Sequence, residues 1–125
     1  MSNKITALLT AWRAERHIKK PLGSQHFEAA IESEVDEYTL ACTNNDLHEK
    51  VDAINDILIL CKNELALMGY EETLCQKQTI KEISSRRQDP AQAASDWTNE
   101  KWEKDPAQDP DSLYKADYTT CLLTK

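Results

Sequence analysis

The sequence predicts an all-α protein, an antiparallel helical bundle of about four main helices followed by an irregular C-terminal arm. Four stretches repeat apolar residues at every third or fourth position, which is the spacing of one helix face. Glycine occurs only twice in 125 residues, and no stretch alternates β-branched with polar residues as a strand would. We expect one domain over 1–125, with a helical core over 1–88 and the arm over 89–125.

The first two helices are predicted over 4–17 and 24–43. In the first, the residues expected on one apolar side are Ile5, Leu8, Leu9 and Trp12. Pro21 and Gly23 separate the two helices, and Ser24 is expected to be the N-cap of the second. The apolar repeat of the second helix consists of Phe27, Ile31, Val35, Tyr38 and Cys42.

The central helix is predicted over 46–68, after a short link at 43–45 that suits an antiparallel helical hairpin. Asp46 is expected to cap its N-terminus, and Gly69 is expected to end it in the left-handed conformation. Its apolar stripe consists of Leu47, Val51, Ile54, Leu58, Cys61 and Leu65. Because residues 57–61 are apolar on all sides, we expect burial on more than one side, with the acidic face of this helix turned into the protein.

A fourth helix is predicted over 71–87, with Leu74, Ile80 and Ile83 facing inward. The tetrapeptide DPAQ then occurs twice, and a weak helix is expected over 90–103. The arm contains apolar and aromatic anchors, which are Trp97, Trp102, Leu113, Tyr114, Tyr118, Leu122 and Leu123. We therefore expect it to pack on the domain or on a neighbouring subunit.

Net charge and cysteine spacing limit the classes of function. The net charge of −7 argues against a nucleic-acid polymer or an anionic membrane surface as partner, and favours a cation or a substrate that arrives with one. The four cysteines have no CxxC spacing, which favours buried reduced thiols. No apolar run reaches membrane-spanning length and no signal peptide is recognised, so we expect a soluble, cytoplasmic protein.

Acidic residues on two consecutive helices are the strongest candidate site. Glu34 and Glu37 share one face of the second helix, and the hairpin would bring them opposite acids of the central helix. Those acids are Asp52 and Asp56, and Glu49 lies on the same face of the central helix. Carboxylate oxygens suit Mg²⁺, whereas the plainer interpretation is solvated surface charge.

These elements resemble the MazG-type all-α nucleoside triphosphate pyrophosphohydrolases, in particular the subgroup from phages and mobile elements. That family has ExxE on one helix, followed by an ExxD-type element that runs into an apolar stretch ending in glycine. The matching segments, within residues 25–120, are 34–37, 52–60, Asn63, 68–70, 81–86, 101–102 and 113–118. One departure is Ala53, where the family has an acid. The literal ExxD here is Glu49 to Asp52, but we favour Asp56 with Asp52.

The resemblance implies hydrolysis of a (deoxy)nucleoside triphosphate to the monophosphate and pyrophosphate, with a role in cleansing nucleotide pools. It implies Mg²⁺, or Mn²⁺ as an alternative, and a homodimer or a dimer of dimers. The candidate metal ligands are Glu34, Glu37, Asp52 and Asp56, with Glu49 as a further candidate, and Glu34, Glu37 and Asp56 are the candidate catalytic residues. Weaker candidates for substrate binding are Asn63, Lys81, Arg86, Lys101 and Trp102. The alternative function is a non-catalytic helical interaction protein with an acidic docking face.

Overall fold

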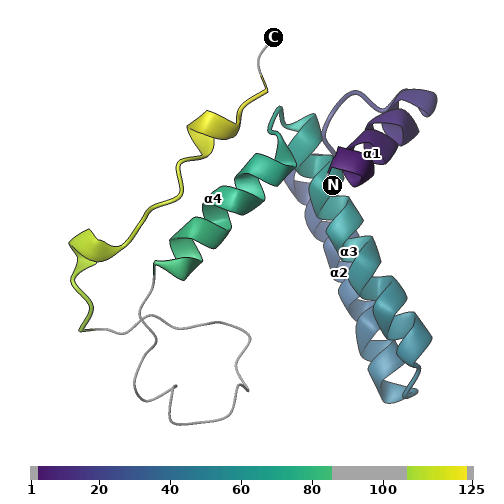
Figure 1. The fold of residues 1–125 in the computed structure, drawn as a ribbon. Helices are drawn as coiled ribbons and strands as arrows, with labels where there is room; N and C mark the ends of the chain where they lie inside the picture. Colours follow the sequence, from purple (N-terminus) through teal and green to yellow (C-terminus); the bar gives the residue numbers. More distant parts are fainter. Residues whose placement is uncertain (1–2, 86–106, 124–125) are drawn as a thin grey trace. The chain divides into compact units, whose positions relative to one another are not determined.

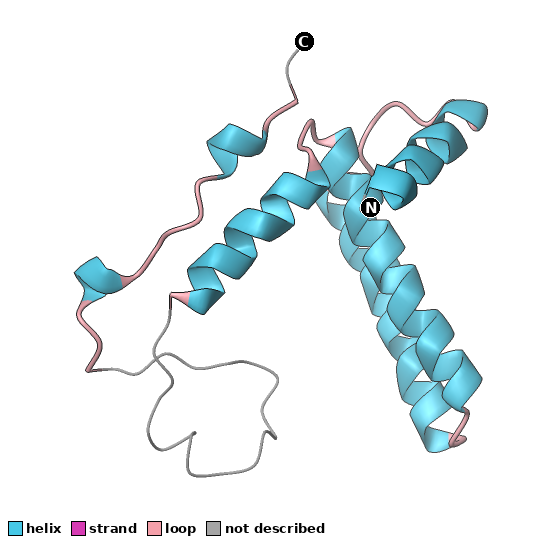
Figure 2. Cartoon of the chain, in the orientation of Figure 1, coloured by secondary structure: helices cyan, strands magenta, loops and turns pink. Residues whose placement is uncertain are grey.

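The computed structural model describes residues 3–85 and 107–123, and this part of the chain is helical with no β-strand (Figures 1 and 2). The prediction of an all-α fold is confirmed. The helices are α1 (Asn3–Glu15), α2 (Ser24–Thr43), α3 (Leu47–Leu67) and α4 (Glu72–Ser84), with short 3-10 helices η1 (Pro110–Ser112) and η2 (Tyr118–Cys121). The weak helix expected over 90–103 lies outside the described residues. None of the described helices combines the length and apolar character that a membrane span requires.

The chain divides into two compact units, Met1–Glu72 and Thr73–Lys125. The first contains α1, α2 and α3, and the second contains nearly all of α4 together with the arm.

Three helices end in the same way, with one residue in the left-handed region. His17 after α1, Asn45 after α2 and Gly69 after α3 have φ angles of 57°, 53° and 95°. At each end, the N–H of this residue and the N–H of the next donate to two carbonyls of the last helical turn. This pair of bonds is the Schellman motif. The predicted role of Gly69 is confirmed.

The N-termini of α2 and α3 begin differently. The Asp46 side chain caps α3 by accepting the N–H of Glu49 at 3.1 Å, as predicted. Ser24 was the wrong N-cap for α2, because the capping position is Gly23 and no side chain caps the helix. Instead, the carboxylate of Glu64 accepts the N–H groups of Leu22 and Gly23, at 2.9 and 3.1 Å, and so joins α3 to the segment before α2.

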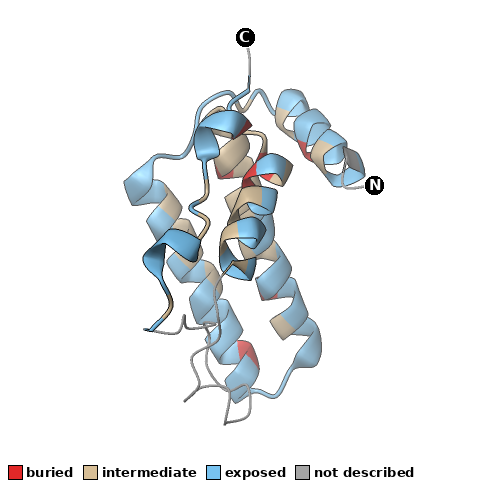
Figure 3. Cartoon of the chain, turned by 60° about the vertical axis from the view of Figure 1, so that its left-hand side comes forward, coloured by how far each residue is buried: buried red, intermediate tan, exposed pale blue. Residues whose placement is uncertain are grey.

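Within the first unit, α2 and α3 lie side by side, and the turn after α2 joins them at one end (Figure 1). Ala41 and Ala53, which are 3% and 2% exposed, are the buried apolar residues of these two helices. Small side chains allow the two backbones to approach closely. The expected burial of residues 57–61 was wrong, because Leu58 and Ile59 are exposed, and most of the surface of both helices is exposed (Figure 3).

Helix α1 contacts the rest of the first unit through few residues. Leu9 is its one buried described residue, and Ile5, Leu8 and Trp12 are exposed, contrary to the expected apolar side. Polar bonds hold it instead: Thr6 donates to the buried Glu72 at 3.0 Å, and Arg13 Nη1 donates to Asn63 Oδ1 at 2.7 Å.

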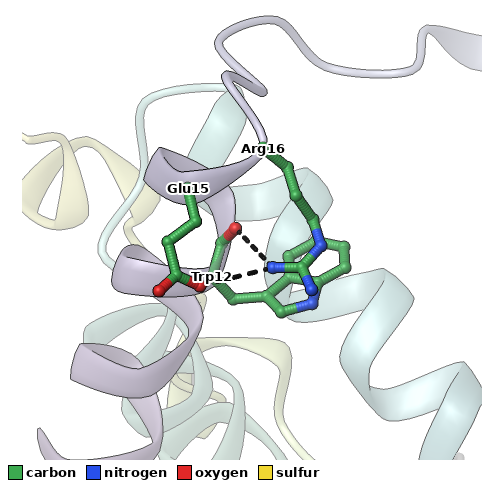
Figure 4. A network of polar contacts seen from close by, with 3 residues as sticks. All are labelled: Trp12, Glu15 and Arg16. Carbon is green, nitrogen blue, oxygen red and sulfur yellow. Dashed lines mark hydrogen bonds and ion pairs between the residues drawn. The ribbon is translucent and has the colours of Figure 1, made fainter.

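At the C-terminal end of α1, Arg16 lies over the ring of Trp12, with its Cζ 4.6 Å from the ring centroid. The same guanidinium donates to the Trp12 carbonyl and pairs with Glu15 (Figure 4). All three residues are exposed, so this cluster covers one face of Trp12 without forming a core.

In the second unit, the arm packs on α4 through hydrogen bonds from its backbone. The Ser85 hydroxyl accepts the N–H of Tyr114 at 2.8 Å, and Glu82 accepts the N–H of Ala116 at 2.8 Å. Gln78 accepts the N–H of Asp117 and the hydroxyl of Tyr114. Side chains of α4 thus satisfy backbone groups of a segment without regular structure.

The buried apolar residues of the second unit are Cys75 and Cys121, which are 5% and 1% exposed. The inward positions predicted for α4 were wrong: Leu74, Ile80 and Ile83 are 41–61% exposed. All four cysteines are free, and the expectation of buried thiols holds for only these two, since Cys42 is exposed and Cys61 is half-buried.

Candidate functional site

Glu34 is the acidic residue that the fold places between α2 and α3. It lies seven residues before Ala41 and seven after Phe27, and all three therefore share the face of α2 that packs on α3. Glu34 is half-buried, and its Oε1 is fully buried without a hydrogen-bond partner in the described part of the chain. A carboxylate oxygen in such a position is costly to leave charged.

The environment of Glu34 raises the pKa of its carboxyl group above the ordinary value. The largest cause is desolvation, followed by the negative charges of Glu37 and Asp56, by a side-chain hydrogen bond with Glu37 and, last, by the charge of Asp52. Together with Glu34 these are the four residues predicted as metal ligands, so the fold brings the other three within electrostatic reach of Glu34. Like charges at such a site resist ionisation together unless a cation or a proton joins them.

The other acids are more open to solvent than predicted. Glu37, Asp52 and Glu49 are exposed and Asp56 is half-buried, so the acidic face of α3 is not turned into the protein. The reason is that α3 meets α2 through Ala53, and its neighbours Asp52 and Asp56 border this contact. Glu49 lies in the first turn of α3, where its N–H is bound by Asp46.

The tight contact at Ala53 leaves no open space for an acidic side chain at this position. Its methyl group is 2% exposed against α2, and a carboxylate in its place would be buried close to Glu34. An acid at this position would add desolvation and repulsion to a site that already has both.

The four carboxylates are the correct chemical class of ligand for Mg²⁺, and a cation beside them would supply the partner that Glu34 Oε1 lacks. Within residues 3–85 and 107–123, no three Asp, Glu, His or Cys side chains are already arranged to hold a metal ion. The residues therefore fit the ion in the chemistry of their oxygen atoms, whereas the described part of the chain does not bring three of them into a metal-binding arrangement.

The candidate substrate-binding residues are dispersed. Asn63 follows Asp56 by seven residues on the same side of α3, and its Oδ1 is bound by Arg13. Lys81 belongs to the second unit, where its Nζ lies 4.3 Å from the centroid of the Tyr114 ring. Arg86, Lys101 and Trp102 lie outside the described residues.

Sequence reasoning missed Arg13 and Glu64. Arg13 is a cation beside the acidic side of α3, and only the fold brings α1 there. Glu64 is 8% exposed, and its placement within an apolar stretch of α3 was the available signal for a buried structural acid.

Comparison of this chain with protein-family models, curated proteins and solved structures finds no match.

Proposed function

We propose that this protein is a Mg²⁺-dependent nucleotide pyrophosphohydrolase, which cleaves a nucleoside triphosphate between its α- and β-phosphates. The observation that carries the proposal is the buried, unpartnered Oε1 of Glu34, beside Glu37, Asp52 and Asp56. The structural acids Glu64 and Glu72 are buried with hydrogen-bond partners, whereas the buried oxygen of Glu34 has none among the described residues, and a bound cation would offset that cost.

In this proposal Glu34, Glu37, Asp52 and Asp56 hold Mg²⁺, or Mn²⁺ as an alternative, with Glu49 as a further candidate. Bound Mg²⁺ supplies neutralisation of phosphate charge and activation of water. Among the acids, Glu34 is suited to accept a proton from the attacking water, because a raised pKa brings a carboxylate closer to the operating pH. Glu37 and Asp56 adjoin it and orient the water.

The proposal includes three further parts that rest on the resemblance and on the charge. The substrate is a nucleotide rather than a nucleic-acid polymer, consistent with the net charge of −7. The protein works in the cytoplasm to cleanse nucleotide pools. It also self-associates, as a homodimer or a dimer of dimers.

The test is pyrophosphate release from a panel of canonical and damaged nucleoside triphosphates, with Mg²⁺ and with EDTA. We expect Mg²⁺-dependent release of pyrophosphate with the monophosphate as co-product. Release of inorganic phosphate alone, or no turnover of any nucleotide, would contradict the proposal.

A second candidate is a non-catalytic helical interaction protein. The exposed apolar residues of α3 favour it, because Leu47 and Val51 are 73% and 51% exposed and suit a protein partner. The two candidates differ in their response to Mg²⁺. A pyrophosphohydrolase should gain thermal stability when Mg²⁺ binds, whereas a docking protein has no reason to do so.

A further inference from the structure

A cavity between α1 and α3 lies on the acidic side of α3. Its volume is about 180 Å³, and its lining includes Trp12 and Arg13 of α1 together with Asn63 and Glu64 of α3. Asn63 follows Asp56 by seven residues, which places it roughly 10 Å further along the same side of the helix. The cavity is smaller than the roughly 300–1,000 Å³ of sites that enclose a whole small ligand, so it suits a single ring system.

The bond from Arg13 fixes the orientation of the Asn63 amide. An arginine only donates, so the atom 2.7 Å from its Nη1 must be the amide oxygen. The Nδ2 group of Asn63 therefore remains as a hydrogen-bond donor, and no described residue accepts from it. A molecule in the cavity that carries a carbonyl oxygen can accept this bond.

Glu64 supplies a hydrogen-bond acceptor beside the Asn63 donor. Its two oxygens accept the N–H groups of Leu22 and Gly23, and an ionised carboxylate has about four acceptor positions. Unused lone pairs of a residue that is 8% exposed and lines the cavity can accept a ring N–H. Asn63 and Glu64 are adjacent in sequence, so the donor and the acceptor come from neighbouring positions of α3.

Two cations and an aromatic ring also line the cavity, and its remaining lining is aliphatic: Ile18, Leu22, Leu60 and Leu67. Arg13 and Lys20 border the cavity in a chain of net charge −7, and they can attract a phosphate. Trp12 also borders it, and Arg16 covers one face of its ring. An aromatic ring beside a cavity of this size can contact a flat base.

We infer that this cavity binds the base of the nucleotide and selects bases with a lactam edge, an N–H beside a carbonyl. Uracil, thymine, guanine and hypoxanthine have this edge, whereas adenine and cytosine do not. This inference rests on the proposed function for the cleavage, but binding of the base does not require it. A base without the lactam edge leaves the polar groups of Asn63 and Glu64 unpaired. The free-energy cost of these unpaired groups lowers the affinity for such a base.

The experiment is calorimetric binding of the monophosphates of thymidine, deoxyguanosine, deoxyadenosine and deoxycytidine to the full chain in EDTA. We expect the first two to bind at least tenfold more tightly than the last two. Equal affinity for all four, or no binding at all, would overturn the inference.

The decisive variant is Asn63→Asp, which replaces the donor by an acceptor and keeps an oxygen for Arg13. We expect this variant to bind thymidine monophosphate at least tenfold more weakly than wild type does, and to lose the preference for thymidine monophosphate over deoxyadenosine monophosphate. The matched control is Asn55→Asp on the same helix, an exposed residue whose amide donates to Val51. Equal thymidine monophosphate affinity in both variants would contradict the role of Asn63.

The two proposals can fail separately. Mg²⁺-dependent pyrophosphate release with the same KM for all bases would contradict the base-binding cavity and would support the proposed pyrophosphohydrolase activity. Selective binding of lactam bases by a chain that hydrolyses no nucleotide would contradict the proposed enzyme activity and would support the base-binding cavity.

Discussion

Glu34 is the residue at which stability and the proposed chemistry oppose each other. Its Oε1 is buried without a partner, and the pKa of its carboxyl group is raised by desolvation and by Glu37. A carboxyl group with a raised pKa in the folded state stabilises the fold when protonated. That contribution is present below its unfolded value of about 4.5 and is lost as the pH rises through the raised value.

Replacing Glu34 by glutamine should therefore stabilise the metal-free protein at neutral pH. Glutamine keeps the shape of the side chain and carries no charge at any pH. In EDTA we expect a higher Tm than wild type at pH 7, with the difference disappearing near pH 4. The control is Glu32→Gln, an exposed residue of the same helix. Melting curves at the two pH values check this, and a lower Tm at pH 7 would count against a strained carboxylate.

Asp56 gives the corresponding test of catalysis. Asp56→Asn removes one charge and one ligand oxygen while keeping the size of the side chain. We expect pyrophosphate release to fall by about 10²–10³-fold, as when one stabilising group is removed from an active site. The fold should persist, because the repulsion on Glu34 decreases. If Asp56→Asn retains the parental rate, Glu49 and Asp52 become the next pair to test.

At the scale of the helices, both ends of α3 could be predicted from sequence, whereas the N-cap of α2 and the buried faces could not. Asp46 and Gly69 act through local backbone chemistry, which the sequence displays directly. Burial depends on which helices meet, and so Leu58 is exposed within an apolar run while Ala53 is buried. The same limit applies to the site: spacing identified the acids, but only the packing of α2 on α3 distinguishes Glu34 from the rest.

The residues in the left-handed conformation at three helix ends predict how glycine or alanine substitutions there change the free energy of unfolding. A side chain at positive φ strains the backbone and destabilises the fold at His17 and Asn45, and asparagine tolerates this conformation better than most residues. We expect His17→Gly to raise the free energy of unfolding by about 0.5–1 kcal/mol and Asn45→Gly to raise it less. Urea unfolding measures both.

Gly69→Ala provides the opposite control for these two changes. No atom lies within 4 Å of an added Cβ at Gly69, so any loss comes from its φ of +95° and not from a clash. We expect Gly69→Ala to lower stability by about 1 kcal/mol. A gain in stability with alanine would show that the left-handed turn is not maintained.

At the scale of the whole molecule, the apolar side of α3 is exposed in the part of the chain that the structure describes. Leu47, Val51, Ile54 and Leu58 are 47–73% exposed and follow one another at spacings of four, three and four residues. This is the heptad spacing of a helix that packs on another helix. At 100° per residue the stripe lies on the side of α3 opposite to Asp52 and Asp56.

A second copy of the chain fits this stripe. The four side chains carry no charge, so two copies can pair there without the repulsion that a net charge of −7 would cause elsewhere. We expect sedimentation to show a dimer or a dimer of dimers at micromolar concentration.

Leu58→Lys should dissociate this assembly, because pairing would bury one uncompensated charge from each copy. Ile59→Lys, at the neighbouring exposed position, is the control and should remain associated. Because Asp56 lies on the other side of α3, the Mg²⁺ response should persist in Leu58→Lys. A wild-type chain that sediments as a compact monomer at micromolar concentration would refute self-association.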